Sequence, residues 1–429
     1  MSTVDHLSLL STPLPNDLGF GLHNNLLSQV SCPRDIPSSV FSNVVKPGAT
    51  PTNQQASGRC WLFAALNFLR RPMMEKYKLP GSFELSQSYM FFWDKLERVN
   101  YMLKAYEETR DQPWDDRTVS FLLQEPLGDG GQWQMFTALV KKYGVVPKDV
   151  YGESKHSGNS AGINMVLTRL LREWAQEIRE GKPGMFDRTQ ALQTTYRILC
   201  QFMGKPPMTF VWEYKNTADE VVCTERMTPQ SFYKDFVGID LDDYVSVIHD
   251  PRNVYDKSYG VTYLGNVVED KMVRHLNVAM SDIETMVEKT IIQNETVWFG
   301  ADVGQHFHSK TQSLDQNTFA YDKYLGLTFI QSKKSKLEYR ESMMTHAMLI
   351  TGFHKPKNQT QISRWQVENS WGTDGSRGGY LTMTTDWMRD YVYQVVVNKK
   401  FLTDAQKEAW NGEVECMLPP WDPMGALAV

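Results

Sequence analysis

The sequence predicts an α+β fold built from at least two lobes. Its 429 residues are enough to bury more than one large core. Between residues 60 and 203, apolar side chains recur at the three- and four-residue spacing of helices. Between residues 296 and 398, short β-rich runs separated by glycines indicate a small antiparallel β-barrel. Helices and strands therefore occupy different parts of the chain, as in α+β proteins.

The first expected helix begins at Cys60. The apolar run from there to Leu69 places Leu62, Leu66 and Leu69 on one face. Further helices are expected over Ser86–Tyr106, Gln134–Tyr143, two segments of 163–203 separated by Gly181–Gly184, and Ser281–Gln293. Strands are expected over Thr209–Tyr214, Tyr244–Ile248, Thr296–Val303, 345–353, 364–369, 379–384 and 392–398. A short helix at Asn16–Leu27 is also expected.

Composition excludes several classes of function. The formal net charge of −5 gives no support for general binding to nucleic acid or anionic membranes. No apolar stretch of about 18 residues is present, so no transmembrane helix is expected, and no secretory signal is expected at the start. The five cysteines are scattered and form no CxxC pair. We therefore expect a cytoplasmic protein with no disulfide framework, no metal and no cofactor; the pair His306 and His308 lacks the other ligands of a metal site.

Cys60 is the candidate nucleophile. It follows a polar turn, Gln54 to Arg59, and occupies the first turn of the expected helix. Unpaired backbone N–H groups at a helix start favour a thiolate, which is the reactive form of cysteine. A free cysteine in this setting is also a common and inert core residue. The remaining motifs decide between the two readings.

A nucleophilic cysteine needs a base and a group that orients the base. His346 is the histidine that lies within an apolar strand. Asn369, in the run Asn369–Ser370–Trp371–Gly372, is placed to accept from the imidazole, and Trp371 to shield that bond from water. Gly130 and Gly131 allow a backbone to pass close to a ligand, or simply make a turn.

Together these motifs resemble papain-like cysteine peptidases. Gln54 lies six residues before Cys60, and His346 and then Asn369 follow in the order of that family. The resemblance implies that Cys60 is the nucleophile, His346 its base and then acid, and Asn369 the orienting residue. It also implies an oxyanion hole formed by the Gln54 side chain and the Cys60 N–H. Gln55 is the alternative residue for this role, but it is one residue closer to Cys60 than the family spacing requires. Gly130 and Gly131 would bind the substrate backbone.

Two departures point to one branch of the family. Secreted members carry the pattern C-G-[SA]-C-[WY], whereas this chain has Ser57 at the first cysteine. The histidine follows the cysteine by 286 residues instead of about 130–150. With the segments 129–133, 297–300 and 421–428, these features resemble the bleomycin hydrolase branch over nearly the whole chain.

That resemblance implies five segments in a papain-like two-lobed fold. They are an N-terminal arm (1–51), a helical lobe (52–160), an inserted helical and hook module (161–280), a β-barrel lobe (281–400) and a C-terminal arm (401–429) that reaches the cleft of the same subunit. The window from Lys205 to Lys271 holds 7 basic and 12 acidic residues, so a projecting module there would be acidic.

The resemblance further implies a cysteine aminopeptidase that acts on peptides with a free N-terminus and also hydrolyses homocysteine thiolactone and an amide of bleomycin. It implies a homohexamer, and a terminal carboxylate near Ala428 that pairs with the substrate ammonium. Removal of Val429 would leave Ala428 as that terminus. The family's nucleic-acid binding is expected to be weak or absent here, because the inserted module is acidic and the lysines at 333, 334 and 336 form only a short run.

Two other functions stay open at this point. A cysteine endopeptidase or deubiquitinase-like hydrolase would cleave substrates with a blocked N-terminus and would ignore the C-terminal arm. A papain-like scaffold that binds nucleic acid, or forms a chaperone-like chamber, would keep its main activity without Cys60.

Overall fold

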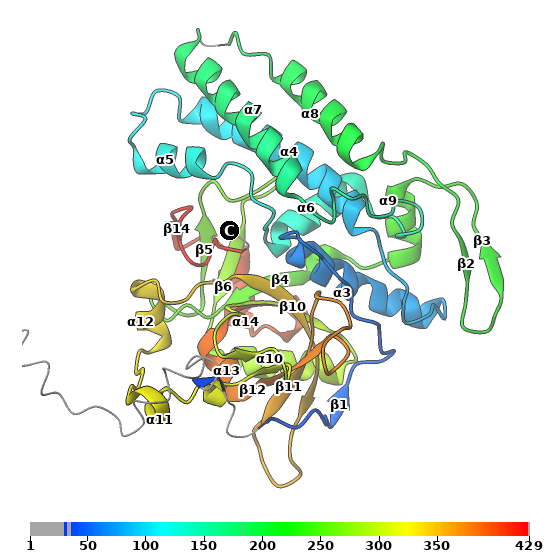
Figure 1. Ribbon diagram of the computed structural model, residues 1–429, viewed down its shortest axis with the longest axis vertical. Helices are drawn as coiled ribbons and strands as arrows, with labels where there is room; N and C mark the ends of the chain where they lie inside the picture. Colours follow the sequence, from blue (N-terminus) through cyan, green and yellow to red (C-terminus); the bar gives the residue numbers. More distant parts are fainter. Residues whose placement is uncertain (1–29, 32–35, 183, 428–429) are drawn as a thin grey trace, which may run out of the picture.

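The computed structural model describes residues 30–31, 36–182 and 184–427. The expected helix at Asn16–Leu27 lies outside these residues, as do Ala428 and Val429. In the described residues the first half of the chain is mainly helical and the second half is built around one large sheet (Figure 1). The expected α+β class is confirmed. The helices of the first half are α3 (Cys60–Lys76), α4 (Gln87–Glu108), α5 (Arg117–Gln124), α6 (Trp133–Tyr143), α7 (Ala161–Glu180) and α8 (Arg188–Met203).

Helix α3 is the central element of the fold. Cys60 is its first residue, and most of its side chains are buried, including the two charged residues Arg70 and Arg71. It packs against α4 and α6 on one side and against strand β10 (His346–His354) on the other. The helix continues beyond the expected apolar run, and these arginines find buried partners there. Arg70 donates to Glu368, at the end of strand β11 (Arg364–Glu368), at 2.8 Å, and Arg71 also contacts Glu368.

Helices α7 and α8 pack on α4 at the far side from the sheet (Figure 1). Both were expected within 163–203, and they are separated by the Gly181–Gly184 segment as predicted. Ser86 caps α4, where its hydroxyl accepts from the backbone N–H of Tyr89 at 3.0 Å. The later helices are α9 (Pro229–Phe232), α10 (Met280–Ile292), α11 (Tyr321–Leu325), α12 (Lys333–Glu338), α13 (Thr385–Tyr391) and α14 (Asp404–Asn411).

Within the described part of the chain, the large sheet has twelve strands in the order β14-β5-β6-β4-β13-β7-β10-β11-β12-β9-β8, with β1 paired to β10. A separate hairpin, β2–β3, projects from the helical side (Figure 1). The strands are β1 (Asn43–Val44), β2 (Glu213–Lys215), β3 (Val221–Cys223), β4 (Tyr244–Ile248), β5 (Lys257–Val261), β6 (Arg274–Asn277), β7 (Val297–Ala301), β8 (Phe307–His308), β9 (Ser313–Leu314), β10 (His346–His354), β11 (Arg364–Glu368), β12 (Tyr380–Thr384), β13 (Val392–Asn398) and β14 (Cys416–Leu418).

The sheet is larger than the antiparallel barrel that the sequence predicts. Strands β4, β5 and β6 lie in the segment expected to form an inserted module, yet β4 pairs with β13 and so extends the main sheet. Three strand pairs are parallel among the residues described, β4 with β6, β5 with β14, and β9 with β12. Each parallel pair joins two strands that are not consecutive in the chain. The sheet therefore contains strands from both sides of the expected boundary at residue 280. The five-segment division as a whole stays a prediction.

Two apolar cores flank the central strands. One lies between the helices and the sheet and contains residues of α3, α4 and α6, and the other lies between the sheet and α10 and α13. Strands β7, β10 and β13 are buried along nearly their whole length. These strands and α3 thus form a rigid frame, and the candidate site residues lie at its edges.

Candidate active site

Cys60 lies at the junction between the helices and the sheet. As the first residue of α3 it is 1% exposed, and the backbone N–H of Ala347 in β10 donates to its Sγ at 3.4 Å. The carbonyl of Arg59 accepts from the N–H groups of Leu62 and Phe63, which fixes the first turn of the helix. The sequence prediction of a helix-start cysteine is therefore correct, and the thiol lies beside the residue that follows His346.

His346 and Asn369 meet because β10 and β11 are antiparallel. The start of β10 lies next to the end of β11, and His346 and Asn369 occupy these two positions. The imidazole Nε2 is 2.8 Å from Asn369 Oδ1, and both residues are buried. An amide oxygen accepts, so Nε2 carries the hydrogen and Nδ1 is the ring nitrogen that remains for a thiol proton.

Trp371 covers this pair. Its ring centroid is 4.9 Å from that of His346, with an angle of 32° between the rings. The indole is 42% exposed, so it stands between the imidazole and solvent. Phe307 packs against its other edge, with centroids 5.6 Å apart. The shielding that the sequence predicts for Trp371 thus corresponds to its position.

Gln54 reaches the site and Gln55 does not. The carboxamide of Gln54 is buried, accepts from the Ser370 hydroxyl at 2.6 Å and donates through Nε2 to the Ser57 carbonyl at 2.7 Å. Its backbone N–H also donates to Ser370, at 2.8 Å. Gln55 has a positive φ of 55° and an exposed side chain that lies against Gly158. Gln54 is therefore the glutamine joined to the Asn369 segment.

Gly131 is required by close packing. A Cβ atom on this residue would lie 2.7 Å from the Trp61 ring, a distance that real Cβ contacts do not show. The neighbouring carbonyl of Gly130 accepts from Arg98 at 2.6 Å, and the Trp61 indole N–H donates to the Asp129 carbonyl at 2.8 Å. The glycine segment thus lies against Trp61, the residue that follows Cys60 in the first turn of α3.

The Asp129 carboxylate fastens this segment, and sequence reasoning gave it no role. It accepts from the Gly58 N–H at 2.9 Å and from Lys95 and Asn164 at 2.7 Å each, and it also contacts Ser160. Burial alone would raise the pKa of Asp129, but Lys95 and the hydrogen bonds hold it well below its usual range. The signal in the sequence was an acidic residue between glycines, but its partners are distant in the chain.

The C-terminal arm reaches the same region. Strand β14 pairs with β5, and Asp422 accepts from Arg252 at 2.8 Å. Further on, the Ala426 carbonyl accepts from Gln132, next to Gly131, at 3.3 Å. Leu427 is buried and lies over Gly300, which pairs with Ala347. The arm therefore ends, within the described residues, between the glycine segment and strand β7, which pairs with the strand of His346. Ala428 follows directly but lies outside them.

A cavity of about 520 Å³ opens beside the arm. Its walls come from the glycine segment, the arm, α5 and the residues that precede His346; they include Gly130, Gly131, Phe121, Met343, Trp421 and Leu427. A substrate that lies along Gly130 and Gly131 would meet the arm here.

Burial dominates the ionisation of the candidate pair. It raises the pKa of the Cys60 thiol to about 11, although the N–H groups of Ala347 and Trp61 favour the thiolate. Burial also lowers the pKa of His346 to about 4, opposed by the bond to Asn369. Proton transfer between the two groups creates both charges together, and each then stabilises the other.

Acid should lower the free energy of unfolding, because several histidines are buried in their neutral form in the folded chain. Burial lowers the pKa of His249, His275 and His346 to about 4 each, against an ordinary value of 6.5. Between pH 6.5 and 4 the unfolded chain binds protons that the folded chain does not. The free energy of unfolding therefore decreases as the pH is lowered, by up to about 1.4 kcal/mol per pH unit for each histidine. Urea unfolding at pH 7 and pH 5 measures this change. His275→Gln should reduce it, and an unchanged difference in that variant would contradict the assignment.

The remaining sequence candidates do not form a second site. Lys333 and Lys336 are buried: Lys333 donates to the Arg389 carbonyl at 3.0 Å, and Lys336 to Asp390 at 2.7 Å. Only Lys334 of that run is exposed. Over the residues that the structure covers, no group of three or more His, Cys, Asp or Glu could hold a metal ion. In the same residues no helix is long and apolar enough to cross a bilayer.

Known proteins are similar to this chain over nearly its whole length. The profile of the peptidase C1-like family matches residues 23–425. Aminopeptidase C of Lactobacillus delbrueckii subsp. lactis is 41% identical over 399 residues, covering 90% of this chain and 88% of the relative. Bleomycin hydrolase of Mus musculus is 39% identical over 405 residues, covering 91% and 89%. The crystal structure of PepW from Lactobacillus rhamnosis matches with a TM-score of 0.87 and 39% identity, covering 94% of this chain and 91% of that one.

Proposed function

Because this chain belongs to the peptidase C1-like family and is a cysteine aminopeptidase, we propose that Cys60 is its nucleophile and His346 its base and then its acid. The observation that carries the proposal is the convergence of three separate segments. The backbone beside His346 donates to Cys60 Sγ, while the His346 ring is bonded to Asn369. Asn369 orients the ring, and Trp371 keeps water from the His346–Asn369 bond.

The reaction follows from these positions. The Cys60 proton passes to His346 Nδ1 as the sulfur attacks the substrate carbonyl, and the carbonyl π electrons move to its oxygen. Gln54 Nε2 and the Cys60 N–H donate to that oxyanion. The C–N bond then breaks, and the leaving amine takes the proton from the imidazole. Water, deprotonated by His346, hydrolyses the resulting thioester and restores the thiol.

The arm restricts the substrate to a free amino terminus. Gln132 and Gly300 hold Ala426 and Leu427 beside the glycine segment, which supports a terminal carboxylate near Ala428 in the cleft. A carboxylate there pairs with an ammonium group and leaves no room for a longer chain on that side. Gly130 and Gly131 bind the backbone of the N-terminal part of the peptide. Trimming of Val429 would place the carboxylate on Ala428.

Small acyl compounds with a free amine also meet the requirement for a free amino terminus. Homocysteine thiolactone has an α-amino group next to a thioester carbonyl, and nothing precedes that amine. The amide of bleomycin offers the same attack by Cys60 with loss of ammonia. Resemblance to the bleomycin hydrolase branch supports both substrates, a homohexameric assembly and a cytoplasmic location. Some members of the family bind nucleic acid, but the net acidic inserted module of this chain supports weak or absent binding.

Variants of the two supporting amides test this site. Gln54→Ala should lower kcat by about 10²–10³, the usual cost of losing one oxyanion donor. Asn369→Ala should cost about 10², because a misplaced ring still transfers the proton. In both variants KM for an aminoacyl coumarylamide should change little, since neither side chain is proposed to bind the substrate in its ground state. A wild-type kcat in Gln54→Ala would contradict the proposed role of Gln54 as an oxyanion donor.

A further inference from the structure

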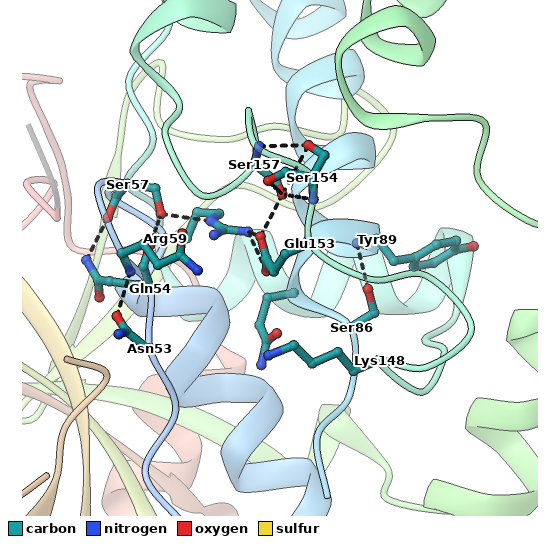
Figure 2. A network of polar contacts seen from close by, with 12 residues as sticks. Asn53, Gln54, Ser57, Arg59, Ser86, Tyr89, Lys148, Glu153, Ser154 and Ser157 are labelled. Carbon is teal, nitrogen blue, oxygen red and sulfur yellow. Dashed lines mark hydrogen bonds and ion pairs between the residues drawn. The ribbon is translucent and has the colours of Figure 1, made fainter. Parts of the chain in front are cut away.

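The residues Gln54 to Cys60, here named the nucleophile turn, carry both proposed oxyanion donors. Ser57 sits in the middle of this turn and ties it together. Its hydroxyl donates to the Gln54 carbonyl at 2.6 Å, and its own carbonyl accepts from Gln54 Nε2 at 2.7 Å (Figure 2). The position of the Gln54 carboxamide therefore depends on where Ser57 is held.

Arg59 holds Ser57 from the interior. Its guanidinium is fully buried, and Nε donates to the Ser57 hydroxyl at 2.8 Å. Nη1 donates to both carboxylate oxygens of Glu153 at 3.1 Å, and Glu153 in turn accepts from Ser157 at 2.6 Å (Figure 2). Burial alone would raise the pKa of Glu153, but Arg59 holds it below its ordinary value. The turn is thus fastened to a segment 94 residues further along the chain.

Packing fixes the orientation of this arginine. Its guanidinium carbon lies 5.1 Å from the centroid of the Phe63 ring and 5.3 Å from that of Phe91. These rings and Glu153 contact the guanidinium while its Nε donates to Ser57. A buried ion pair is a poor source of stability compared with apolar packing, because desolvation offsets the attraction. What the pair gives instead is a defined direction for the Nε–H bond.

Secreted papain-like peptidases have a cysteine at the position of Ser57. Here the same position is held by hydrogen bonds to a buried arginine. We propose that Arg59 is a positioning residue for the oxyanion hole: paired with Glu153, it acts through Ser57 to aim the Gln54 carboxamide. This inference rests on the proposed role of Gln54 and gives a role to Arg59, Glu153 and Ser57, which take no part in the proposed mechanism.

Arg59→Lys and Ser57→Ala test the inference, each alone and in the Gln54→Ala background. Lysine keeps the charge but has no N–H at the Nε position, and alanine removes only the hydroxyl. Each single change should lower kcat about 10-fold, less than the about 10² that a misplacement of 1 Å costs. KM should stay near wild type. In Gln54→Ala, neither change should lower kcat further, because their target is already gone.

Alkylation of Cys60 by iodoacetamide separates positioning from general damage. That reaction needs the thiolate but no oxyanion hole, so its rate should be unchanged in both variants. Arg179→Lys is the matched control, since this arginine donates to the Thr109 and Gln112 carbonyls, away from the turn, and kcat should be unaffected. Equal losses with and without Gln54, or a parallel loss of alkylation, would overturn the inference. A wild-type kcat in Gln54→Ala alone would instead overturn the proposed role of Gln54.

Discussion

Replacing Cys60 with alanine should lower kcat by a factor on the order of 10⁵–10⁶, the cost seen when a nucleophile of this kind is removed. His346→Ala should cost about as much, because its Nδ1 takes the thiol proton. The double variant should be no slower than either single one, since the two groups act as a unit. Steady-state hydrolysis of an aminoacyl coumarylamide by the reduced protein measures all three.

Cys200→Ala is the control for the loss of a thiol. Cys200 is a free cysteine on α8, away from the nucleophile turn, and its replacement should leave kcat unchanged. Cys60 in His346→Ala should also react slowly with iodoacetamide at neutral pH, because burial raises the pKa of the thiol to about 11 and no base remains. Multiplying losses in the double variant would show that Cys60 and His346 act separately.

Deleting residues 426–429 should convert the site from an aminopeptidase cleft to an open one. The deletion removes the Ala426 and Leu427 contacts and the carboxylate beyond them. KM for a substrate with a free amine should rise about 10- to 100-fold, because a bond to a charged group contributes about 1.5–3 kcal/mol. Cleavage of N-acetylated and longer peptides should appear, since the blocking segment is gone.

Deletion of Val429 alone is the matched control for the arm. It leaves Ala426 and Leu427 in place, so the preference for a free amine should persist. Circular dichroism of both truncated chains should match that of the full chain, because β14 still pairs with β5. Persistent rejection of acetylated peptides after deletion of 426–429 would show that another element closes the cleft.

Local patterns predicted much of the fold. Apolar spacing located helices α3, α4, α7 and α8, and β-rich runs located β7 and β10–β13, within a few residues. The segments that carry Cys60, His346, Asn369 and Gln54 are joined by hydrogen bonds in the fold, while the roles of these residues stay predictions. The resemblance to bleomycin hydrolase is confirmed by the relatives of this chain. These features are encoded over short stretches or in fixed spacings, which is why sequence reasoning found them.

Long-range polar pairing could not be predicted in the same way. Arg59 looks like a surface charge before an apolar run, yet its partner Glu153 lies 94 residues away and both are largely buried. Arg70 meets Glu368 across 298 residues, and Asp129 meets Lys95 across 34. Helical periodicity carries no information on such partners. The joining of β4 to β13 was missed for the same reason, since register between distant strands is fixed only in the folded sheet.

The measurement that most directly tests the central claim compares one aminoacyl coumarylamide with its N-acetylated form, using the wild-type chain beside Cys60→Ala. The account predicts that wild type hydrolyses only the free-amine substrate and that Cys60→Ala hydrolyses neither. Equal hydrolysis of the acetylated form by wild type would contradict the claim that the C-terminal arm selects free amino termini, and activity in Cys60→Ala would contradict the thiol mechanism itself.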